Sequence, residues 1–183
     1  MSYKLFLKFQ DDRAHINLEN IHSTHVIQKI ITCFNYKYRT KLNALILKNI
    51  NELIYDMNGV VILDKFIANC EIKVVLENLV FFVNNNIYSF SVNKYSNYVV
   101  QSLIRHCIMY NDLFASLAES VLQFFVKLSV NRYGNYIINL ILCYVNSDVK
   151  ISIIKSLKAE GVYDNIFFNK YGKSIIYNLL KNE

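Results

Sequence analysis

The sequence of 183 residues contains no proline and only four glycines, and no stretch rich in glycine or serine interrupts it. Proline and glycine are the residues that most often mark turns and linkers, so nothing in the sequence indicates a boundary between domains. The length is that of one domain with an extensive hydrophobic core. We therefore expect a single domain spanning residues 1–183.

Long apolar runs are also lacking, although 54% of the residues are hydrophobic and the mean hydropathy is +0.21. The longest uncharged segment, residues 78–93, contains three consecutive asparagines and is shorter than the roughly 20 apolar residues that cross a bilayer. Residues 1–10 are too often interrupted by lysine to form a signal peptide. The sequence therefore predicts no membrane association.

Motifs of catalysis and metal binding are absent as well. The sequence contains no nucleophile elbow, phosphate-binding loop or zinc-protease motif, so we do not expect an enzyme, a cofactor or a small-molecule substrate. His22 and His25 have no third ligand nearby, which argues against a metal site. The cysteines follow each other at intervals of 37, 37 and 36 residues, at Cys33, Cys70, Cys107 and Cys143. Without a Cys-x-x-Cys pair, we expect buried thiols in a reducing compartment.

The sequence contains instead one short pattern in five copies. The copies begin at intervals of 36, 37, 38 and 38 residues, at Asn20, Asp56, Asn93, Asn131 and Asn169. A fixed period in this range is typical of proteins built from stacked repeats, in which each unit buries its apolar face against its neighbours. A high apolar content is natural in such a protein.

Three columns of the pattern predict the start of a helix. The first column is always Asn or Asp, which cap helix N-termini. The third residue after it is small in every copy: Ser23, Gly59, Ser96, Gly134 and Gly172. Because glycine costs a helix up to about 1 kcal/mol, we expect close approach of a neighbouring helix or of a ligand there. An apolar pair follows in every copy, as in Val99–Val100.

Helical spacing separates a core face from a polar face in the third copy. Tyr95, Val99, Leu103 and Cys107 recur every four residues and form an apolar stripe, whereas Asn97, Tyr98 and Gln101 share the opposite face. A second helix is predicted ahead of each later copy, over residues 42–55, 72–87, 113–128 and 149–162, with Asp112 and either Ser147 or Asp148 as caps. The sequence therefore predicts an all-α protein.

Positive charge is in excess, with a net charge of +6 and a pI of about 9.0. A basic balance permits nucleic-acid binding without establishing it. Lys94, Arg132 and Lys170 occupy one column, directly after the cap. Two interpretations of this column stay open, a solvated helix start and a row of cations that faces phosphates.

The strings at residues 94–101 and 132–139 resemble the second helix of PUF (Pumilio-type) RNA-binding repeats. The period, the small residue and the apolar pair match that family in all five copies. The resemblance implies a curved α-solenoid, wound as a right-handed superhelix, of PUF-type helical repeats. The repeats would be centred near residues 20–34, 56–70, 93–107, 131–145 and 169–182.

The resemblance also implies which side chains contact RNA. PUF repeats read single-stranded RNA at about one base per repeat. In the third copy Asn97 and Gln101 would contact a base edge and Tyr98 would stack between bases, a combination that the family uses for uracil. In the fourth copy the same positions are filled by Asn135, Tyr136 and Asn139.

The remaining copies fit the family's code less well. The first copy offers Thr24, His25 and Gln28, with His25 able to stack on a base. The second has Val60, Val61 and Asp64, which suit base reading poorly. The fifth has Lys173, Ser174 and Tyr177, where the lysine would hold phosphate.

Two departures from the family limit what the resemblance implies. No copy contains the Ser-Asn-x-x-Glu combination that the family uses for guanine, so the resemblance does not imply a UGU preference. Typical members also have about eight repeats with end caps, whereas this sequence has five. It is therefore either a fragment of a longer array or a reduced form whose ends are covered by a partner or by self-association.

The resemblance implies a protein that binds single-stranded RNA, with messenger RNA as its partner and uracil as the preferred base. Its role would be post-transcriptional and translational regulation in the cytoplasm, with protein effectors on the convex face. Two alternatives stay open. One is a nuclear or nucleolar ribosome-biogenesis factor that binds the RNA backbone with little base preference, and the other is a protein-interaction scaffold.

Overall fold

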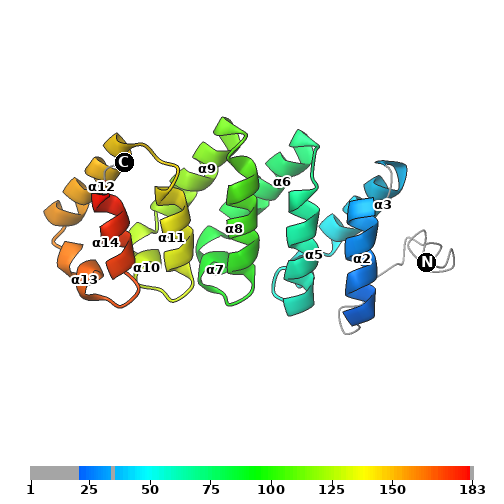
Figure 1. Ribbon diagram of the computed structural model, residues 1–183, viewed down its shortest axis with the longest axis horizontal. Coiled ribbons are helices and arrows are strands. Elements are labelled where there is room, and N and C mark those ends of the chain that lie inside the picture. Colours follow the sequence, from blue (N-terminus) through cyan, green and yellow to red (C-terminus); the bar gives the residue numbers. More distant parts are fainter. Residues whose placement is uncertain (1–20, 34–35, 182–183) are drawn as a thin grey trace. The chain divides into compact units, whose positions relative to one another are not determined.

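The computed structural model describes residues 21–33 and 36–181, and all secondary structure within these ranges is helical (Figure 1). The prediction of an all-α protein is therefore confirmed. In the described ranges no helix is both long and apolar enough to cross a membrane. The chain divides into two compact units, residues 1–72 and 73–183.

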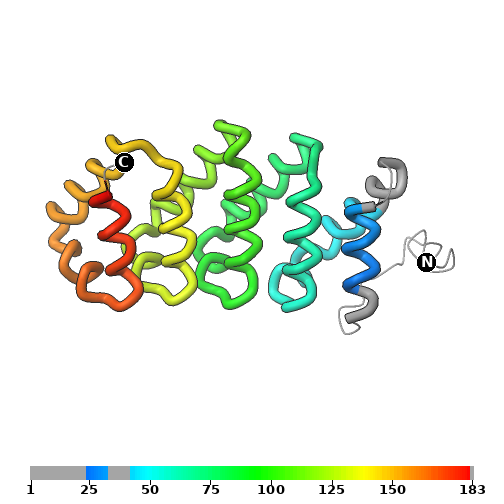
Figure 2. Tube along the Cα trace, in the orientation of Figure 1, coloured from blue at the N-terminus to red at the C-terminus, as the bar shows by residue number. Residues whose placement is uncertain are grey.

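The first unit brings together the helices of the first two copies of the pattern. Its helices are α2 (Ile21–Cys33), α3 (Tyr36–Lys48), α4 (Ile50–Leu53) and α5 (Met57–Ala68). Helix α2 packs along α5, and the short α4 packs against the start of α5 (Figure 2). The core of this unit includes the buried side chains of Ile27 and Ile31 in α2 and of Ile62 and Phe66 in α5. Within this unit, the first copy thus packs against the second.

The second unit contains three repeats, each composed of a long, a short and a second long helix. They are α6 (Lys73–Asn84), α7 (Ile87–Val92) and α8 (Ser96–Cys107); α9 (Asn111–Leu122), α10 (Phe125–Ser129) and α11 (Gly134–Leu142); and α12 (Ser147–Ala159), α13 (Tyr163–Phe168) and α14 (Lys173–Leu180). Helices α8, α11 and α14 lie side by side, as do α6 with α9 and α7 with α10 (Figure 1). The apolar pair of the pattern is fully buried in all three repeats.

Ahead of each later copy the structure has a long helix followed by a short one, where a single helix was predicted. The predicted ranges 42–55 and 113–128 span both helices, whereas 72–87 and 149–162 correspond mainly to the long helices α6 and α12. Side-chain amides compete with the backbone at two of the breaks, since Asn49 donates to the Leu45 carbonyl at 2.7 Å and Asn86 to the Phe82 carbonyl at 3.1 Å. After α12 the chain turns at Gly161, whose φ is 68°, a conformation that glycine adopts readily. The apolar residues continue through these breaks in the sequence, so their pattern alone did not indicate where one helix ends and the next begins.

The predicted caps of the repeated helix are confirmed in the second to fifth copies. The side-chain oxygens of Asp56, Asn93, Asn131 and Asn169 each accept hydrogen bonds of 2.8–3.2 Å from the backbone N–H groups two and three residues later. Asn20 lies outside the described residues.

The predicted caps of the long preceding helices are wrong. Helix α12 is capped by Asn146, which accepts from Val149 N at 3.0 Å, and not by Ser147 or Asp148. Helix α9 begins after Tyr110 without a side-chain cap. Asp112 instead forms an ion pair across the repeats. The cap of α12 therefore lies one residue before Ser147, and α9 has no side-chain cap.

The small-residue column is explained by the approach of the preceding short helix. A Cβ at Gly59 or Gly172 would collide with the carbonyl oxygen six residues earlier, and one at Gly134 would lie 2.9 Å from that of Leu128. In the third copy Ser96 is buried, and its hydroxyl donates to the Phe90 carbonyl at 2.9 Å. Of the two explanations offered by the sequence, helix contact accounts for the column without a ligand.

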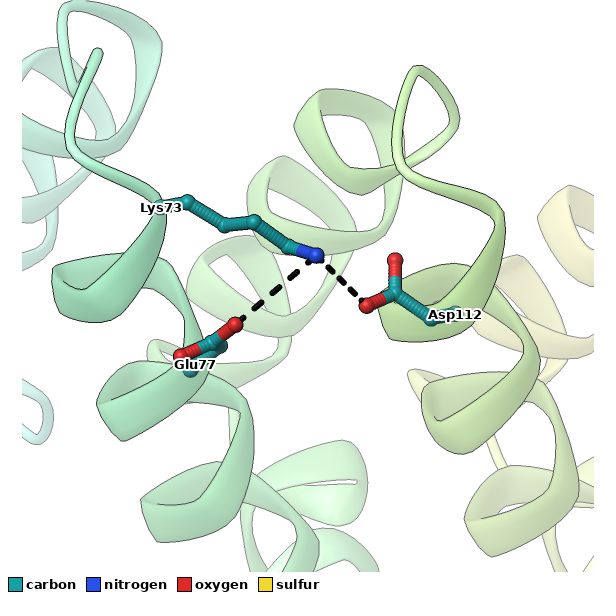
Figure 3. A network of polar contacts seen from close by, with 3 residues as sticks. All are labelled: Lys73, Glu77 and Asp112. Atoms are coloured by element: carbon teal, nitrogen blue, oxygen red, sulfur yellow. Dashed lines mark hydrogen bonds and ion pairs between the residues drawn. The ribbon is translucent and has the colours of Figure 1, made fainter.

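An ion pair joins the long helices α6 and α9 on the surface of the second unit (Figure 3). Lys73 Nζ lies 2.8 Å from Asp112 Oδ2 and 3.8 Å from Glu77 Oε1. The hydrogen bond to Asp112 raises the pKa of Lys73, and the same bond lowers the pKa of Asp112. Because all three side chains are exposed to solvent, the pair stabilises the seam only weakly.

The prediction of buried cysteines holds for two of the three whose side chains are described. Cys70 and Cys107 are buried, whereas Cys143 is exposed, so the prediction for Cys143 is wrong. Helix α8 continues to Cys107, but the corresponding helix α11 already ends at Leu142. The chain therefore turns away from the core at the position that the period assigned to the core.

Candidate nucleic-acid interface

Helix α8 presents the three predicted residues of the third copy in different environments. The ring of Tyr98 is 61% exposed, whereas Asn97 and Gln101 are only 1% and 8% exposed. The two amides contact each other, since Gln101 Nε2 donates to Asn97 Oδ1 at 3.0 Å. The structure therefore brings these residues together as an exposed aromatic ring beside a largely buried pair of amides.

This amide pair belongs to a longer series of hydrogen bonds along α8. Asn97 Nδ2 donates to the Asn93 carbonyl at 2.8 Å, and Arg105 Nη2 donates to Gln101 Oε1 at 3.1 Å. Arg105 was not singled out from the sequence. Its spacing of four residues from Gln101 would have indicated a shared helix face.

The fourth copy repeats the arrangement only in its first half. Asn135 is buried and donates to the Asn131 carbonyl at 2.9 Å, and Tyr136 is 60% exposed. Asn139, however, contacts α14, because its Nδ2 donates to Ser174 Oγ at 3.1 Å and its Oδ1 accepts from Asn178 Nδ2 at 2.6 Å. Asn178 could not be identified from the sequence pattern, because this contact spans 39 residues.

Of the three predicted residues, the first copy leaves two polar side chains accessible and the second copy only one. Thr24 is buried, and its hydroxyl has no hydrogen-bond partner among the described residues. His25 is exposed and Gln28 is half-buried. In the second copy Val60 is buried, while Val61 and Asp64 are exposed.

All three predicted residues of the fifth copy are exposed. Ser174 accepts from Asn139 and donates to the Tyr171 carbonyl at 3.1 Å, so it is part of the contact between copies. Lys173 Nζ lies 6.0 Å from the ring centre of Tyr177. This copy replaces a buried first residue by an exposed cation, which suits contact with an anion better than reading of a base.

One exposed column crosses the neighbouring helices of the second unit. The three residues considered for RNA contact in each copy are called its triplet. The middle residue of the triplet is exposed in all five copies: His25, Val61, Tyr98, Tyr136 and Ser174. Since α8 and α11 pack side by side, two solvent-facing rings occupy equivalent positions on adjacent helices. Exposed aromatic rings in this arrangement can act as stacking platforms for bases.

A second column carries positive charge. In three successive repeats the cation after the cap lies over the ring of the next residue, at 4.4 Å for Lys94 on Tyr95 and 4.8 Å for both Arg132 on Tyr133 and Lys170 on Tyr171. The three cations are exposed, and none has a carboxylate partner within the described residues. The rings therefore hold the cations without neutralising them.

No metal site is found among the described residues of these columns, and a cavity in the second unit lies apart from them. Over the described residues no three His, Cys, Asp or Glu side chains are placed to hold a metal ion. A cavity of about 460 Å³ lies in the second unit between residues 122–127 and α12, and it is lined by none of the predicted contact residues. The exposed side chains of the two columns lie outside this cavity.

Comparison with known proteins identifies the repeat. The model of the Pumilio-family RNA binding repeat matches residues 20–42, 86–108 and 124–157, which contain the first, third and fourth copies. The chain carries PUF repeats. The second and fifth copies, whose triplets depart most from the family's code, lie outside the matched segments. No curated protein matches the sequence.

Solved structures of PUF domains share the fold. The Puf3 RNA binding domain bound to a Cox17 RNA 3′ UTR site has a TM-score of 0.77 and 17% identity over 98% of this chain and 49% of its own. The RNA-binding domain of yeast Puf5p bound to SMX2 RNA has a TM-score of 0.77 and 17% identity over 96% and 48%. PUF-8 in complex with PBE-RNA has a TM-score of 0.76 and 21% identity over 87% and 45%. The chain spans about half the length of these PUF chains.

Proposed function

We propose that this PUF-repeat protein binds single-stranded RNA and reads bases with α8 and α11. The observation that carries the proposal is the exposed ring of Tyr98 beside the Asn97–Gln101 amide pair, within a PUF repeat. The solved domains that share the fold are described as bound to RNA. In α11 the exposed ring of Tyr136 provides the second platform.

Uracil is the base proposed for the third repeat. A carboxamide offers one donor and one acceptor, which match the uracil edge. Stacking on an aromatic ring contributes about 1–3 kcal/mol per base. Lys94, Arg132 and Lys170 supply a row of un-neutralised cations that suits the RNA backbone.

The biological role proposed with this site is post-transcriptional regulation of messenger RNA in the cytoplasm. The five repeats act as one RNA-binding domain, and protein effectors bind the convex face. A second candidate function is binding of the RNA backbone with little base preference. It is favoured by Val60 and Val61 in the second copy, whose side chains offer no hydrogen bond to a base.

The test is a fluorescence-polarisation titration of the full chain at two salt concentrations. The probes are labelled oligouridine, a UGU-containing RNA, oligoadenosine, an RNA hairpin and DNA of the same length. Tyr98→Ala is the variant of choice, because the ring is exposed and its removal leaves the core intact. Asn97→Ala would be ambiguous, since Asn97 is buried and hydrogen-bonded. Phe81→Ala is the matched control, an exposed aromatic ring on α6 away from both columns.

We expect tighter binding to uridine-containing single strands, weakened by roughly five- to a hundredfold in Tyr98→Ala and unchanged in Phe81→Ala. Equal and steeply salt-dependent binding to every probe would instead support backbone binding without base reading. No binding to any probe at low salt would overturn the proposal.

A further inference from the structure

Three side chains on α8 and the Asn93 carbonyl just before it form an unbroken series of hydrogen bonds that all point in one direction. Arg105 Nη2 donates to Gln101 Oε1 at 3.1 Å, Gln101 Nε2 to Asn97 Oδ1 at 3.0 Å, and Asn97 Nδ2 to the Asn93 carbonyl at 2.8 Å. The groups follow each other at intervals of four residues, so one helix face carries the whole series. It begins at an exposed guanidinium and ends at a backbone carbonyl.

The two ends of the series determine the orientation of the amides between them. An arginine side chain can only donate hydrogen bonds, and a backbone carbonyl can only accept them. Turning the Gln101 amide by 180° would direct its N–H groups at the guanidinium and its oxygen at Asn97 Oδ1. Both contacts would then be repulsive. Arg105 therefore keeps Gln101 Oε1 on the side of the next helical turn and Nε2 on the side of Asn97.

The orientation of the Gln101 amide matters because uracil and cytosine present opposite patterns of hydrogen-bond donors and acceptors. Uracil has an acceptor at O4 and a donor at N3–H, whereas cytosine has a donor at N4 and an acceptor at N3. Each amide of the series uses one N–H and one oxygen lone pair internally, so Gln101 keeps one of each for a base. A base stacked on Tyr98 cannot turn over without leaving the ring.

We propose that Arg105 is a positioning residue that makes the third repeat discriminate uracil from cytosine. It acts through Gln101, by fixing the order of donor and acceptor that the base meets. This inference rests on the proposed function. It adds to the predicted triplet a fourth residue, one helical turn beyond the base-edge amide.

The third copy is the one in which this arrangement exists. The residues four positions after the last triplet residue are Thr32, Ala68, Cys143 and Lys181 in the other copies. Only Lys181 among them is a donor-only side chain, and it follows Tyr177, which has no amide to orient. In the fourth copy Asn139 is instead held by Ser174 and Asn178.

The test compares the affinities of the full chain for ten-nucleotide oligouridine and oligocytidine, measured by fluorescence polarisation. Arg105→Met removes the donor, and Arg105→Lys keeps a donor-only cation. Lys155→Met, an exposed cation on α12 outside the columns, controls for the loss of one positive charge. Thermal melting checks that each variant folds, which the exposure of Arg105 leads us to expect.

We expect Arg105→Met to reduce the uridine-to-cytidine affinity ratio by roughly tenfold, the effect of one hydrogen bond to a charged group. Arg105→Lys should keep most of the ratio, and Lys155→Met should leave it unchanged. In RNA-free protein, hydrogen exchange of the Gln101 side-chain amide should become faster in Arg105→Met.

Three results would overturn the inference. A wild-type ratio retained in Arg105→Met would show that the guanidinium does not set the preference. Equal wild-type affinity for the two RNAs would show that there is no discrimination to explain, while leaving RNA binding intact. Absence of wild-type binding to both RNAs would refute the proposed function and the inference with it.

Discussion

Asn178 on α14 donates a hydrogen bond of 2.6 Å to the side-chain oxygen of Asn139 on α11. The same asparagine on α11 donates through Nδ2 to Ser174 Oγ at 3.1 Å. Two polar contacts thus join the fourth and fifth repeats at the predicted RNA-contacting residues. In a stacked-repeat protein stability depends on such contacts between neighbours.

Replacing Asn178 by alanine should destabilise the chain by about 1 kcal/mol, the net contribution of a typical internal hydrogen bond. Urea denaturation followed by circular dichroism would measure the change. Asn165→Ala provides the control, because Asn165 is exposed on α13. Equal stability of Asn178→Ala and Asn165→Ala would show that the contact between repeats contributes nothing.

Gly134→Ala tests the contact between α10 and α11. Helix propensity alone predicts that this change stabilises the protein by up to about 1 kcal/mol. The new Cβ, however, would lie 2.9 Å from both Leu128 O and Leu128 Cδ2. Overpacking of this kind costs about 1–3 kcal/mol, so we expect net destabilisation in urea. A variant more stable than the wild type would contradict the packing argument.

The Lys73–Asp112 ion pair should make a small contribution that depends on pH and salt. The pKa of Asp112 is lowered, so the pair stabilises the fold above the ordinary aspartate pKa of about 4 and loses this effect as the pH falls through the folded value. The pKa of Lys73 is raised. At high pH, the stabilisation by the ion pair is therefore complete below the ordinary lysine pKa. It is lost as the pH rises through the pKa of Lys73 in the folded protein.

Asp112→Asn should therefore lower the urea midpoint slightly near neutral pH in low salt. The difference from wild type should disappear at about pH 2 and in about 1 M salt, where the Debye length is near 3 Å. Asp164→Asn, an exposed carboxylate on α13 without an ion-pair partner among the described residues, is the control. A difference that persists in high salt would point to a cause other than the ion pair.

Cys143 should react with a thiol reagent in the native protein, whereas Cys70 and Cys107 should react only on unfolding. The first is exposed and the other two are buried, and burial raises the pKa of the Cys70 thiol, which lowers its thiolate population. Mass spectrometry of the alkylated chain, with Cys143→Ala for comparison, would locate the label. Rapid native labelling of Cys107 would contradict the burial of the end of α8.

Much of the fold could be predicted because its determinants act within a few residues of each other. The cap at Asn93 bonds to amides two and three residues later, and the contact that requires a small residue at Gly134 is with a backbone group only six residues away. The period of the pattern then places equivalent apolar residues against each other. By itself, the sequence determined the starts of the repeated helices and their buried apolar pairs in the second to fifth copies, and the repeat family.

The tertiary structure decided features that depend on where neighbouring segments lie. The burial of Asn97, the bond from Asn178 to Asn139 and the exposure of Cys143 depend on adjoining helices or on where a helix ends. Base contact by the triplets stays a prediction. From the spacing in the sequence, residues could be assigned to the faces of a helix. Which atom of an amide is already bonded, and which is left for a base, follows only from the three-dimensional arrangement, because hydrogen bonds require distances that a sequence pattern does not contain.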